Sequence, residues 1–366
     1  MYQITLPCDG RATAYASRMA PKLQSIINDY LNNGRCCIVK LRNGDEYEIG
    51  VGSNTYTRKF LTKLSDLSFL QRFLLFSPQQ QIKLIETMRN KWKCQNEILF
   101  QSLTKNTINR YYKGITSKKI DHFNEVMYDI FVVCGYENKN GASGFDKRQF
   151  IVDSGLGICP YCSEEEIEPT DNTKKQIDHF LPKRQYPFLA MSYYNLIPSC
   201  VTCNDVGRKG SNDPLKSKLG LTNAIVNPYI FKPEWIRYHL KLLTANAYNN
   251  ADFELLLGFK TEHLLNGYNE FFDISDRQAR HNNVAAADYR RFMKYKAEHY
   301  YEGMAIDAEW IKNAFESTLA FDPTEDVPEK ELHHRMRHDV FEQLVKTRIP
   351  DSYFVKNAQN TPVRLD

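Results

Sequence analysis

The chain has 366 residues, of which 42% are hydrophobic and 13% aromatic, and 48 Lys and Arg residues stand against 44 Asp and Glu residues. This length and composition support two or three packed domains and exclude a disordered chain. The net charge of +4 does not by itself indicate a nucleic-acid partner. Because no run of 18 apolar residues and no signal-peptide pattern is present, we expect a soluble, cytoplasmic protein without a membrane partner.

The N-terminal region is expected to be mixed but mostly helical. Two short apolar stretches around Asn43-Gly44 predict a small hairpin, because this dipeptide favours a tight turn. Helices are then predicted over residues 67–76 and 80–92.

A further helix with one apolar face is predicted near residue 125. Its apolar residues recur at i, i+4, i+7 and i+8, a spacing more typical of a core helix than of a binding site: Phe123, Met127, Ile130 and Phe131. The glycine- and asparagine-containing segment 135–144 is interpreted as a linker.

Two CxxC pairs occupy the middle of the chain, Cys159 with Cys162 and Cys200 with Cys203. The two-residue spacing lets two thiolates from one turn reach one face of a tetrahedral Zn²⁺. One such pair would equally indicate a redox role, but two pairs predict a structural zinc site. Such a site is closed, so it holds the fold together and performs no hydrolysis.

The remaining cysteines form an odd set that includes two adjacent residues, which bridge poorly. This set fits free thiols in a reducing compartment and consists of Cys8, Cys36, Cys37, Cys94 and Cys134.

The segment between the two CxxC pairs carries its own polar residues. Asp178 and His179 lie in a short stretch with strand character, where neighbouring side chains point to opposite faces. Asn195 opens a second short apolar stretch that is suited to the return strand of a hairpin. Asn204 is a residue type that starts helices, where backbone N–H groups face an anion. The pattern predicts a hairpin followed by a helix.

Enclosed by the four cysteines, Asp178-His179, Asn195 and Asn204 resemble the HNH endonucleases, the ββα-metal branch of the treble-clef zinc fold. The resemblance covers roughly residues 155–228. It implies that His179 is the general base, that Asn195 orients it, and that Asp178 and Asn204 bind a catalytic cation. It also implies an α+β fold with a central zinc-bound ββα-metal module and mainly helical flanks.

The chemistry of phosphodiester hydrolysis fits these residue types. The reaction needs an activated water and a cation that offsets charge in the transition state. A neutral imidazole such as that of His179 can accept the proton of the water. One carboxylate and one amide oxygen suit Mg²⁺ or Mn²⁺, whereas thiolates select zinc, so the two metal sites should be distinct.

One spacing departs from the family pattern. A lysine and a glycine often follow the last metal ligand by about three residues in HNH proteins, whereas Lys209 and Gly210 follow Asn204 after a slightly longer segment. Lys209 is interpreted as a phosphate contact. Asp205 could replace or assist Asn204 at the cation.

The charge around this motif is locally basic. Residues 174–218 contain eight Lys and Arg residues but only three Asp residues. A basic surface around a metal centre would attract a phosphate backbone, although an ordinary solvated lysine is an equally good interpretation of any one of them. The expected nucleic-acid contacts are Lys183, Arg184, Arg208 and Lys209.

After residue 228 the chain is predicted to be helical again. Four residues share one helical face in this reading: Trp235, Tyr238, His239 and Leu242. Three domains are therefore predicted: a mixed, mostly helical domain over 1–145, the HNH module over 146–228, and a helical domain over 229–366.

The leading hypothesis is a Mg²⁺- or Mn²⁺-dependent HNH endonuclease with nucleic acid as its partner and DNA as the favoured substrate. The stretch from Ile177 to Lys183, IDHFLPK, is also similar to nucleases of bacterial anti-phage defence, some of which work with an ATPase partner. The alternative is a non-cleaving, zinc-stabilised module that binds nucleic acid or another protein.

Overall fold

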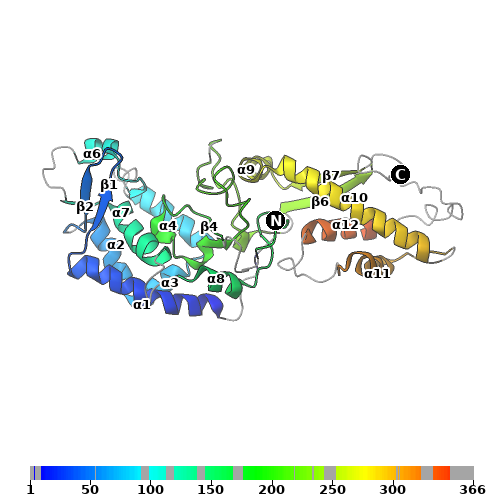
Figure 1. Ribbon diagram of the computed structural model, residues 1–366, viewed down its shortest axis with the longest axis horizontal. Coiled ribbons are helices and arrows are strands. Elements are labelled where there is room, and N and C mark those ends of the chain that lie inside the picture. Colours follow the sequence, from blue (N-terminus) through cyan, green and yellow to red (C-terminus); the bar gives the residue numbers. More distant parts are fainter. Residues whose placement is uncertain are drawn as a thin grey trace. The chain divides into compact units, whose positions relative to one another are not determined.

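The computed structural model of the chain is shown in Figure 1. It describes residues 4, 10–53, 55–91, 99–112, 119–137, 145–167, 176–217, 219–232, 235–242, 253–301, 304, 306–322 and 333–346. Within these residues the protein is mostly helical with small sheets, which confirms the expected α+β class.

The chain forms two compact units. We call Thr5–Gly155 with Glu168–Asn223 the N-terminal unit, and Met1–Ile4, Leu156–Ile167 and Ala224–Asp366 the C-terminal unit. The first unit therefore joins the N-terminal helices to the segment that carries Asp178 and His179. The three-domain division remains a prediction.

The N-terminal unit is built around the long helix α1, which packs against α2 and α3 (Figure 1). Its α-helices are α1 Arg11–Asn32, α2 Tyr56–Leu64, α3 Leu67–Leu74, α4 Pro78–Lys91, α6 Lys105–Tyr111, α7 Phe123–Tyr128 and α8 Lys147–Ser154. The predicted helices over 67–76 and 80–92 correspond to α3 and α4. Trp92, the predicted end of the second helix, lies outside the described residues.

The predicted N-terminal hairpin is confirmed. Strands β1 Cys37–Lys40 and β2 Glu46–Ile49 pair antiparallel, and β3 Lys119–Ile120 adds to β2 in parallel. Gly44 in the turn has a positive φ of 90°, a conformation that glycine adopts without a steric penalty.

The predicted apolar helix near residue 125 is also confirmed, with all four of its apolar residues buried. It begins as α7 and continues as the π-helix η1 Asp129–Tyr136, in which the amide of Glu137 donates to the carbonyl of Val132 at 2.7 Å. Gly135, the predicted start of a linker, is thus part of a helix. Residues 138–144 lie outside the described ranges.

The predicted hairpin around Asp178 and His179 is present. Strands β4 Ile177–His179 and β5 Leu196–Pro198 pair antiparallel, with Asp178 opposite Ile197 and His179 opposite Leu196. The 3₁₀ turns η2 Pro187–Leu189 and η3 Tyr193–Asn195 connect the two strands.

The helix predicted to start at Cys203-Asn204 is wrong, because residues 201–217 contain turns and bends but no helix. This segment is rich in Asn, Asp and Gly, which compete with helical hydrogen bonding and favour turns. Gly210 has a positive φ, and a Cβ atom there would lie 2.6 Å from the carbonyl oxygen of Asp205. The chain therefore folds back on itself where a helix was expected.

The C-terminal unit combines a strand pair with four α-helices and one short 3₁₀-helix among its described residues. Its elements are η4 Pro228–Ile230, β6 Ile236–Leu242, β7 Phe253–Phe259, α9 Glu262–Phe272, α10 Ile274–His299, α11 Ala308–Leu319 and α12 His334–Lys346. Aromatic residues dominate its core, including Phe292, Trp310, Phe315 and Phe341.

The helix predicted from Trp235 to Leu242 is wrong, because residues 236–242 form β6, which pairs antiparallel with β7. The sequence from Ile236 to Leu242 alternates apolar and polar residues, a strand period that competes with the helical spacing. Among the described residues, none of the helices is long and apolar enough to span a membrane.

Candidate functional site

His179 is the last residue of β4 and its imidazole is buried. The Nε2 atom lies 3.1 Å from the carbonyl oxygen of Ala190. Because a carbonyl can only accept, Nε2 must carry the proton in this contact, which leaves Nδ1 as the basic nitrogen of a neutral ring. Burial, followed by the charge of Lys183, lowers the pKa of His179 to about 3, so the ring is neutral at pH 7.

Asn195 is fully buried, and its side-chain amide group is hydrogen-bonded to the main chain of the segment that follows His179. Its Oδ1 accepts from the amide of Leu181 at 2.7 Å, and its Nδ2 donates to the carbonyls of Leu181 and Leu189 at 3.1 and 3.0 Å. The side chain that was predicted to orient His179 thus fixes the loop between β4 and β5. The imidazole itself is hydrogen-bonded to the carbonyl of Ala190.

Asp178 is buried beside a buried lysine. The Nζ atom of Lys209 lies 3.6 Å from Oδ2 of Asp178 and donates to the carbonyls of His179 and Asn212 at 3.2 and 3.1 Å. Lys209 is completely buried, and the contact with nucleic acid predicted for it stays a prediction. Its ammonium offsets the charge of the carboxylate in the Asp-His pair.

Asn204 lies in the turn after Cys203 and is partly buried. The backbone amide of Asn204 donates to the carbonyl of Cys200 at 3.2 Å, and the backbone amide of Lys209 donates to the carbonyl of Cys203 at 3.1 Å. The second CxxC pair and the turn that carries Lys209 are therefore one hydrogen-bonded segment. Asp205, the predicted substitute for Asn204, is exposed.

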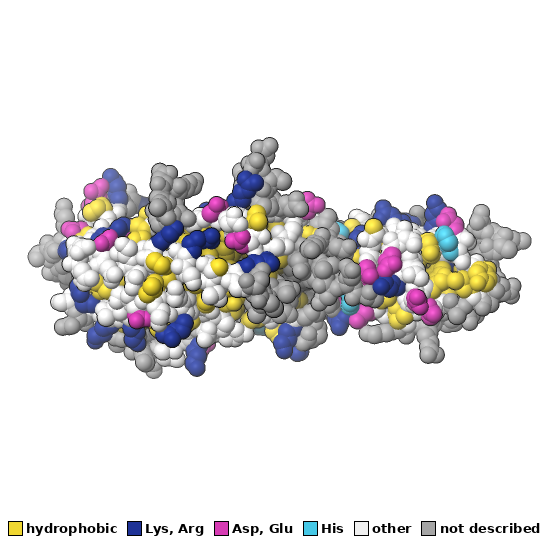
Figure 2. Space-filling model, turned by 90° about the horizontal axis from the view of Figure 1, so that it is seen from below, with side chains coloured by type: hydrophobic (Ala, Val, Ile, Leu, Met, Phe, Trp, Pro, Cys, Tyr) yellow, Lys and Arg dark blue, Asp and Glu magenta, His cyan; other side chains and the backbone are white. Residues whose placement is uncertain are grey.

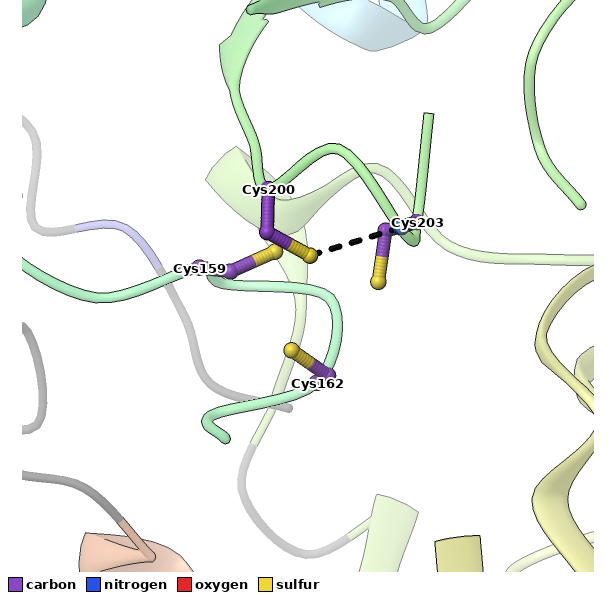
Figure 3. Close-up of side chains that lie close together, drawn as sticks. All are labelled: Cys159, Cys162, Cys200 and Cys203. Carbon is purple, nitrogen blue, oxygen red and sulfur yellow. Dashed lines mark hydrogen bonds between the residues drawn. The ribbon is translucent and has the colours of Figure 1, made fainter. Parts of the chain in front are cut away.

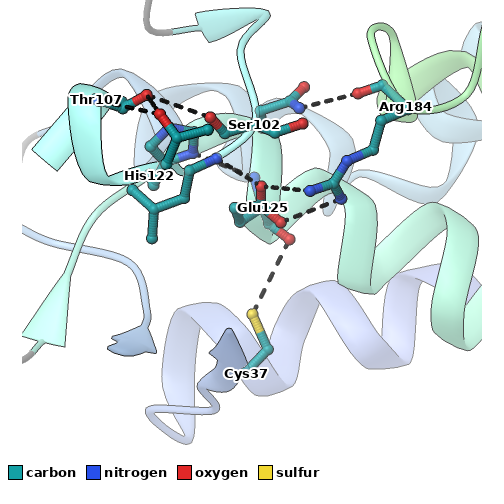
Figure 4. Close-up of polar contacts among 9 residues, drawn as sticks. Cys37, Ser102, Thr107, His122, Glu125 and Arg184 are labelled. Atoms are coloured by element: carbon teal, nitrogen blue, oxygen red, sulfur yellow. Dashed lines mark hydrogen bonds and ion pairs between the residues drawn. The ribbon is translucent and has the colours of Figure 1, made fainter. Parts of the chain in front are cut away.

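Arg184 is tied to α7 by a polar network (Figure 4). Its guanidinium lies 3.1 Å from Oε1 of the buried Glu125, which also accepts from the amide of Leu103 at 2.9 Å. Asn124 donates to the carbonyl of Arg184 at 3.1 Å. Nearly half of the Arg184 side chain remains exposed, so the ion pair does not close it off from solvent.

Lys183 and Arg208, two more of the predicted nucleic-acid contacts, are partly buried. Lys183 pairs with Glu137, and its ammonium lies 5.0 Å from the ring centre of Tyr136. On the face of the molecule in Figure 2, Lys and Arg side chains are interspersed with Asp and Glu side chains. Among the described side chains on this face, neither sign of charge forms a continuous block.

The four cysteines of the two CxxC pairs come together, and all four are buried (Figure 3). Their sulfur atoms all lie within 4.8 Å of one another, and the amide of Cys203 donates to the sulfur of Cys200 at 3.3 Å. A tetrahedral zinc with Zn–S bonds of about 2.3 Å needs sulfur atoms at about 3.8 Å from one another, so the cluster fits a structural zinc.

The first CxxC pair is supported by a buried network within the C-terminal unit. Glu164, two residues after Cys162, lies 3.3 Å from the guanidinium of Arg277 and 2.5 Å from Nε2 of His281. Tyr238 stacks on His281 with parallel rings 5.2 Å apart. The carbonyl of Ser163 accepts from the amide of His333 at 2.8 Å. This network fixes the turn that presents Cys162.

A second group of metal-ligand types lies on α12, where His338, Asp339 and Glu342 come close together. Arg237 already binds both carboxylates, at 2.9 Å from Asp339 and 3.0 Å from Glu342. The amide of Tyr238 also donates to Asp339 at 2.9 Å. The group is thus an ion-pair network that joins α12 to β6.

No family model matches the chain, and no solved structure matches it. Over 108 residues the chain is 36% identical to the Septu protein PtuB of Bacillus thuringiensis. This match covers 28% of this chain and 37% of PtuB. Over 105 residues the chain is 33% identical to protein ea31 of Escherichia phage lambda. That match covers 27% of this chain and 31% of ea31. The chain thus spans about a third of the length of the curated relatives it matches.

The contacts of the site residues with their partners could not be found from the motif. The partners of His179 and Asp178 are Ala190 and Lys209, which lie 11 and 31 residues further along the chain. Tyr136 contacts His179 edge to face, with ring centres 4.4 Å apart, and comes from another element altogether. Only the packing of α7, η1 and the β4–β5 hairpin brings these groups together.

Proposed function

We propose that the protein is a metal-dependent HNH endonuclease that hydrolyses phosphodiester bonds of nucleic acid, with DNA as the favoured substrate. The observation that carries the proposal is the neutral imidazole of His179, whose Nε2 is held by the carbonyl of Ala190. This arrangement leaves Nδ1 as the nitrogen that would accept a proton from the attacking water. The neighbouring Asp178 supplies the carboxylate that such a reaction needs for a cation.

The low pKa of His179 bears on this role. A base works best when its pKa lies near the working pH, and burial brings the pKa of His179 to about 3. An anionic phosphate bound beside the ring would stabilise the imidazolium and raise this pKa. His179 would therefore act as a base mainly when the substrate is bound.

Asp178 and Asn204 would hold the Mg²⁺ or Mn²⁺, since a carboxylate and an amide oxygen are hard donors of the kind these ions prefer. When bound, the cation would offset negative charge on the phosphate in the transition state. Lys209 lies beside the same carboxylate, so the ion would share Asp178 with an ammonium. We therefore expect weak cation affinity that depends on the substrate phosphate.

We also propose that the protein acts in defence against phage, with an ATPase as partner. The partial similarity to the Septu protein PtuB supports the role in defence. The IDHFLPK stretch, which resembles nucleases of anti-phage defence, supports it independently. Structural zinc at the four cysteines would hold the turn before Lys209 in place, because the second CxxC pair belongs to that segment.

The second candidate is a zinc-stabilised module that binds nucleic acid or protein without cutting. The observation in its favour is the buried pair of Asp178 and Lys209, in which the carboxylate already has a cationic partner. A module of this kind would bind nucleic acid in a salt-dependent manner and show no turnover.

The deciding experiment is a cleavage assay on plasmid, linear duplex, single-stranded DNA and RNA with Mg²⁺ or Mn²⁺. Wild type, His179→Ala and the exposed-site control His299→Ala are compared. Cleavage by wild type and by the control, lost in His179→Ala, supports the nuclease and identifies its substrate. If folded, zinc-loaded wild type binds nucleic acid and cuts none of the four substrates with the partner ATPase added, the non-cleaving module is the correct function.

A further inference from the structure

The π-helix η1 is an uncommon feature of this fold. It spans eight residues, Asp129–Tyr136, and ends with the i to i−5 hydrogen bond from Glu137 to Val132. The π geometry is rare and appears mostly as single turns, which are frequent at functional sites. Because the π geometry is unfavourable, contacts with the surrounding residues must stabilise a π-helix of this length. Such contacts are present at both of its ends.

The C-terminal end of η1 contacts the candidate base. Tyr136, its last residue, packs its ring against the imidazole of His179 at 4.4 Å between centres and 70° between planes. Its hydroxyl lies 3.4 Å from the carbonyl of Ile177, the first residue of β4. One side chain thus contacts both the imidazole and the strand that carries it.

The ring of Tyr136 is itself held from several directions. Phe145 stacks on it with centres 5.2 Å apart, and the ammonium groups of Lys147 and Lys183 lie 4.3 and 5.0 Å from its centre. Tyr136 is almost completely buried. A ring with an aromatic and two cationic neighbours has little freedom to turn, so it is a rigid wall for His179.

The residue before Tyr136 contacts the other support of the imidazole. A Cβ atom on Gly135 would lie 3.1 Å from the side chain of Met191, which shows how closely this helix end approaches that segment. The carbonyl of Met191 accepts from the hydroxyl of Tyr15 at 2.8 Å. Met191 directly follows Ala190, whose carbonyl binds Nε2 of His179.

The N-terminal end of η1 is anchored as well. Asp129 accepts from the hydroxyl of Tyr30 at 2.8 Å and pairs with Arg35 at 3.2 Å. With this end fixed, the register of the π-helix decides the direction in which residue 136 points. An α-helical path with one residue fewer would turn that side chain by about 100°.

We infer that Tyr136 is a positioning residue for His179 and that the π-helix brings it to the imidazole. The inference rests on the proposed function, because it gives His179 the role of the base. It adds that the orientation of the ring is set by Tyr136 and Ala190, while Asn195 fixes the loop.

The test is the ¹⁵N NMR spectrum of histidine-labelled protein, with the His179 signals assigned by their loss in His179→Ala. Wild type should show the Nε2-protonated tautomer. Tyr136→Leu should give a mixture of tautomers or a broadened signal, and Tyr136→Phe should keep the wild-type signal because it keeps the ring. Tyr47→Leu, a half-buried tyrosine of β2, is the matched control. An unchanged His179 signal in folded Tyr136→Leu overturns the inference.

Folding of each variant is checked by circular dichroism. If Tyr136→Leu does not fold, Tyr136→Met takes its place, because methionine has a flexible side chain of similar length. In the cleavage assay we expect kcat to fall about 10- to 100-fold in Tyr136→Leu with KM nearly unchanged, and Tyr136→Phe to restore it. Equal kcat in Tyr136→Leu and wild type overturns the inference. If wild type cleaves nothing, the proposed function fails, while the tautomer measurement still decides whether Tyr136 positions the ring.

Discussion

The ammonium of Lys209 lies 3.6 Å from the carboxylate of Asp178, and both side chains are shielded from solvent, with 0% and 1% of their surface exposed. A buried ion pair of this kind is expensive to break, because removal of one partner leaves an uncompensated charge in the interior. The pair also links the turn after Cys203 to β4. The stability of the candidate site therefore depends on a residue that the motif places only as a phosphate contact.

Replacement of Lys209 by methionine should destabilise the protein. Methionine fills a similar volume but leaves Asp178 without its cationic partner, so we expect the free energy of unfolding to fall by about 3–5 kcal/mol. Urea denaturation followed by circular dichroism measures this change. The control is Lys216→Met at an exposed position of the same segment, which should change stability by less than about 0.5 kcal/mol. Equal stability of the two variants would contradict the buried-pair interpretation.

Loss of one cysteine of the cluster should remove the zinc. Wild type is expected to contain about one zinc per chain, and Cys200→Ser should contain less and melt at a lower temperature, because a structural zinc contributes folding energy directly. Metal analysis and thermal melting test this. Cys36→Ser changes a thiol outside the cluster and should keep both the zinc and the melting temperature. If Cys200→Ser keeps its zinc and melts like wild type, the four-cysteine cluster does not hold that zinc.

Glu164 should control how firmly the zinc is held. Glu164→Gln keeps the shape of the side chain but removes the charge that pairs with Arg277 and His281, so the turn after Cys162 loses its support. Loss of such a supporting group typically lowers metal affinity about 10- to 100-fold. Competition with a coloured chelator measures the affinity. Glu166→Gln, at an exposed position, is the matched control, and identical affinities of the two variants would rule out this role.

His122 should make the protein sensitive to mild acid. It is buried at the start of α7, where its Nδ1 accepts from the amide of Glu125, and burial, with the charge of Arg184 second, lowers its pKa to about 4. Between pH 6.5 and about 4 the unfolded chain binds a proton that the folded chain does not. The stability that His122 contributes is therefore complete above pH 6.5 and is lost as the pH falls toward 4.

The size of this effect can be measured by replacement with a residue that does not titrate. His122→Asn keeps an acceptor suited to a helix start. Relative to this variant, wild type should lose up to about 1.4 kcal/mol of stability per pH unit between pH 6.5 and 4.5. Urea denaturation at several pH values provides the test, with His299→Asn at an exposed position as control. Parallel pH profiles of wild type and His122→Asn would mean that His122 does not titrate in this range.

Features that depend on local spacing follow from the amino-acid sequence alone. The two CxxC pairs predicted a cluster of four thiolates, the short apolar stretches around Asp178 and Asn195 predicted the β4–β5 hairpin, and the stripe from Phe123 to Phe131 predicted a buried helix. In each case a spacing along the chain corresponds directly to one turn or one face of an element. The strand at 236–242 was missed because helical and alternating patterns overlap over so short a segment.

The partners of the site residues depend instead on how the chain folds in three dimensions. The contacts of His179 with Ala190 and Tyr136, and of Asp178 with Lys209, join positions 11 to 43 residues apart. The π-helix that brings Tyr136 to the imidazole has no sequence signature, since it depends on anchors at both of its ends. Burial likewise depends on the whole fold, and it converts Lys209 from an expected surface cation into the internal partner of Asp178.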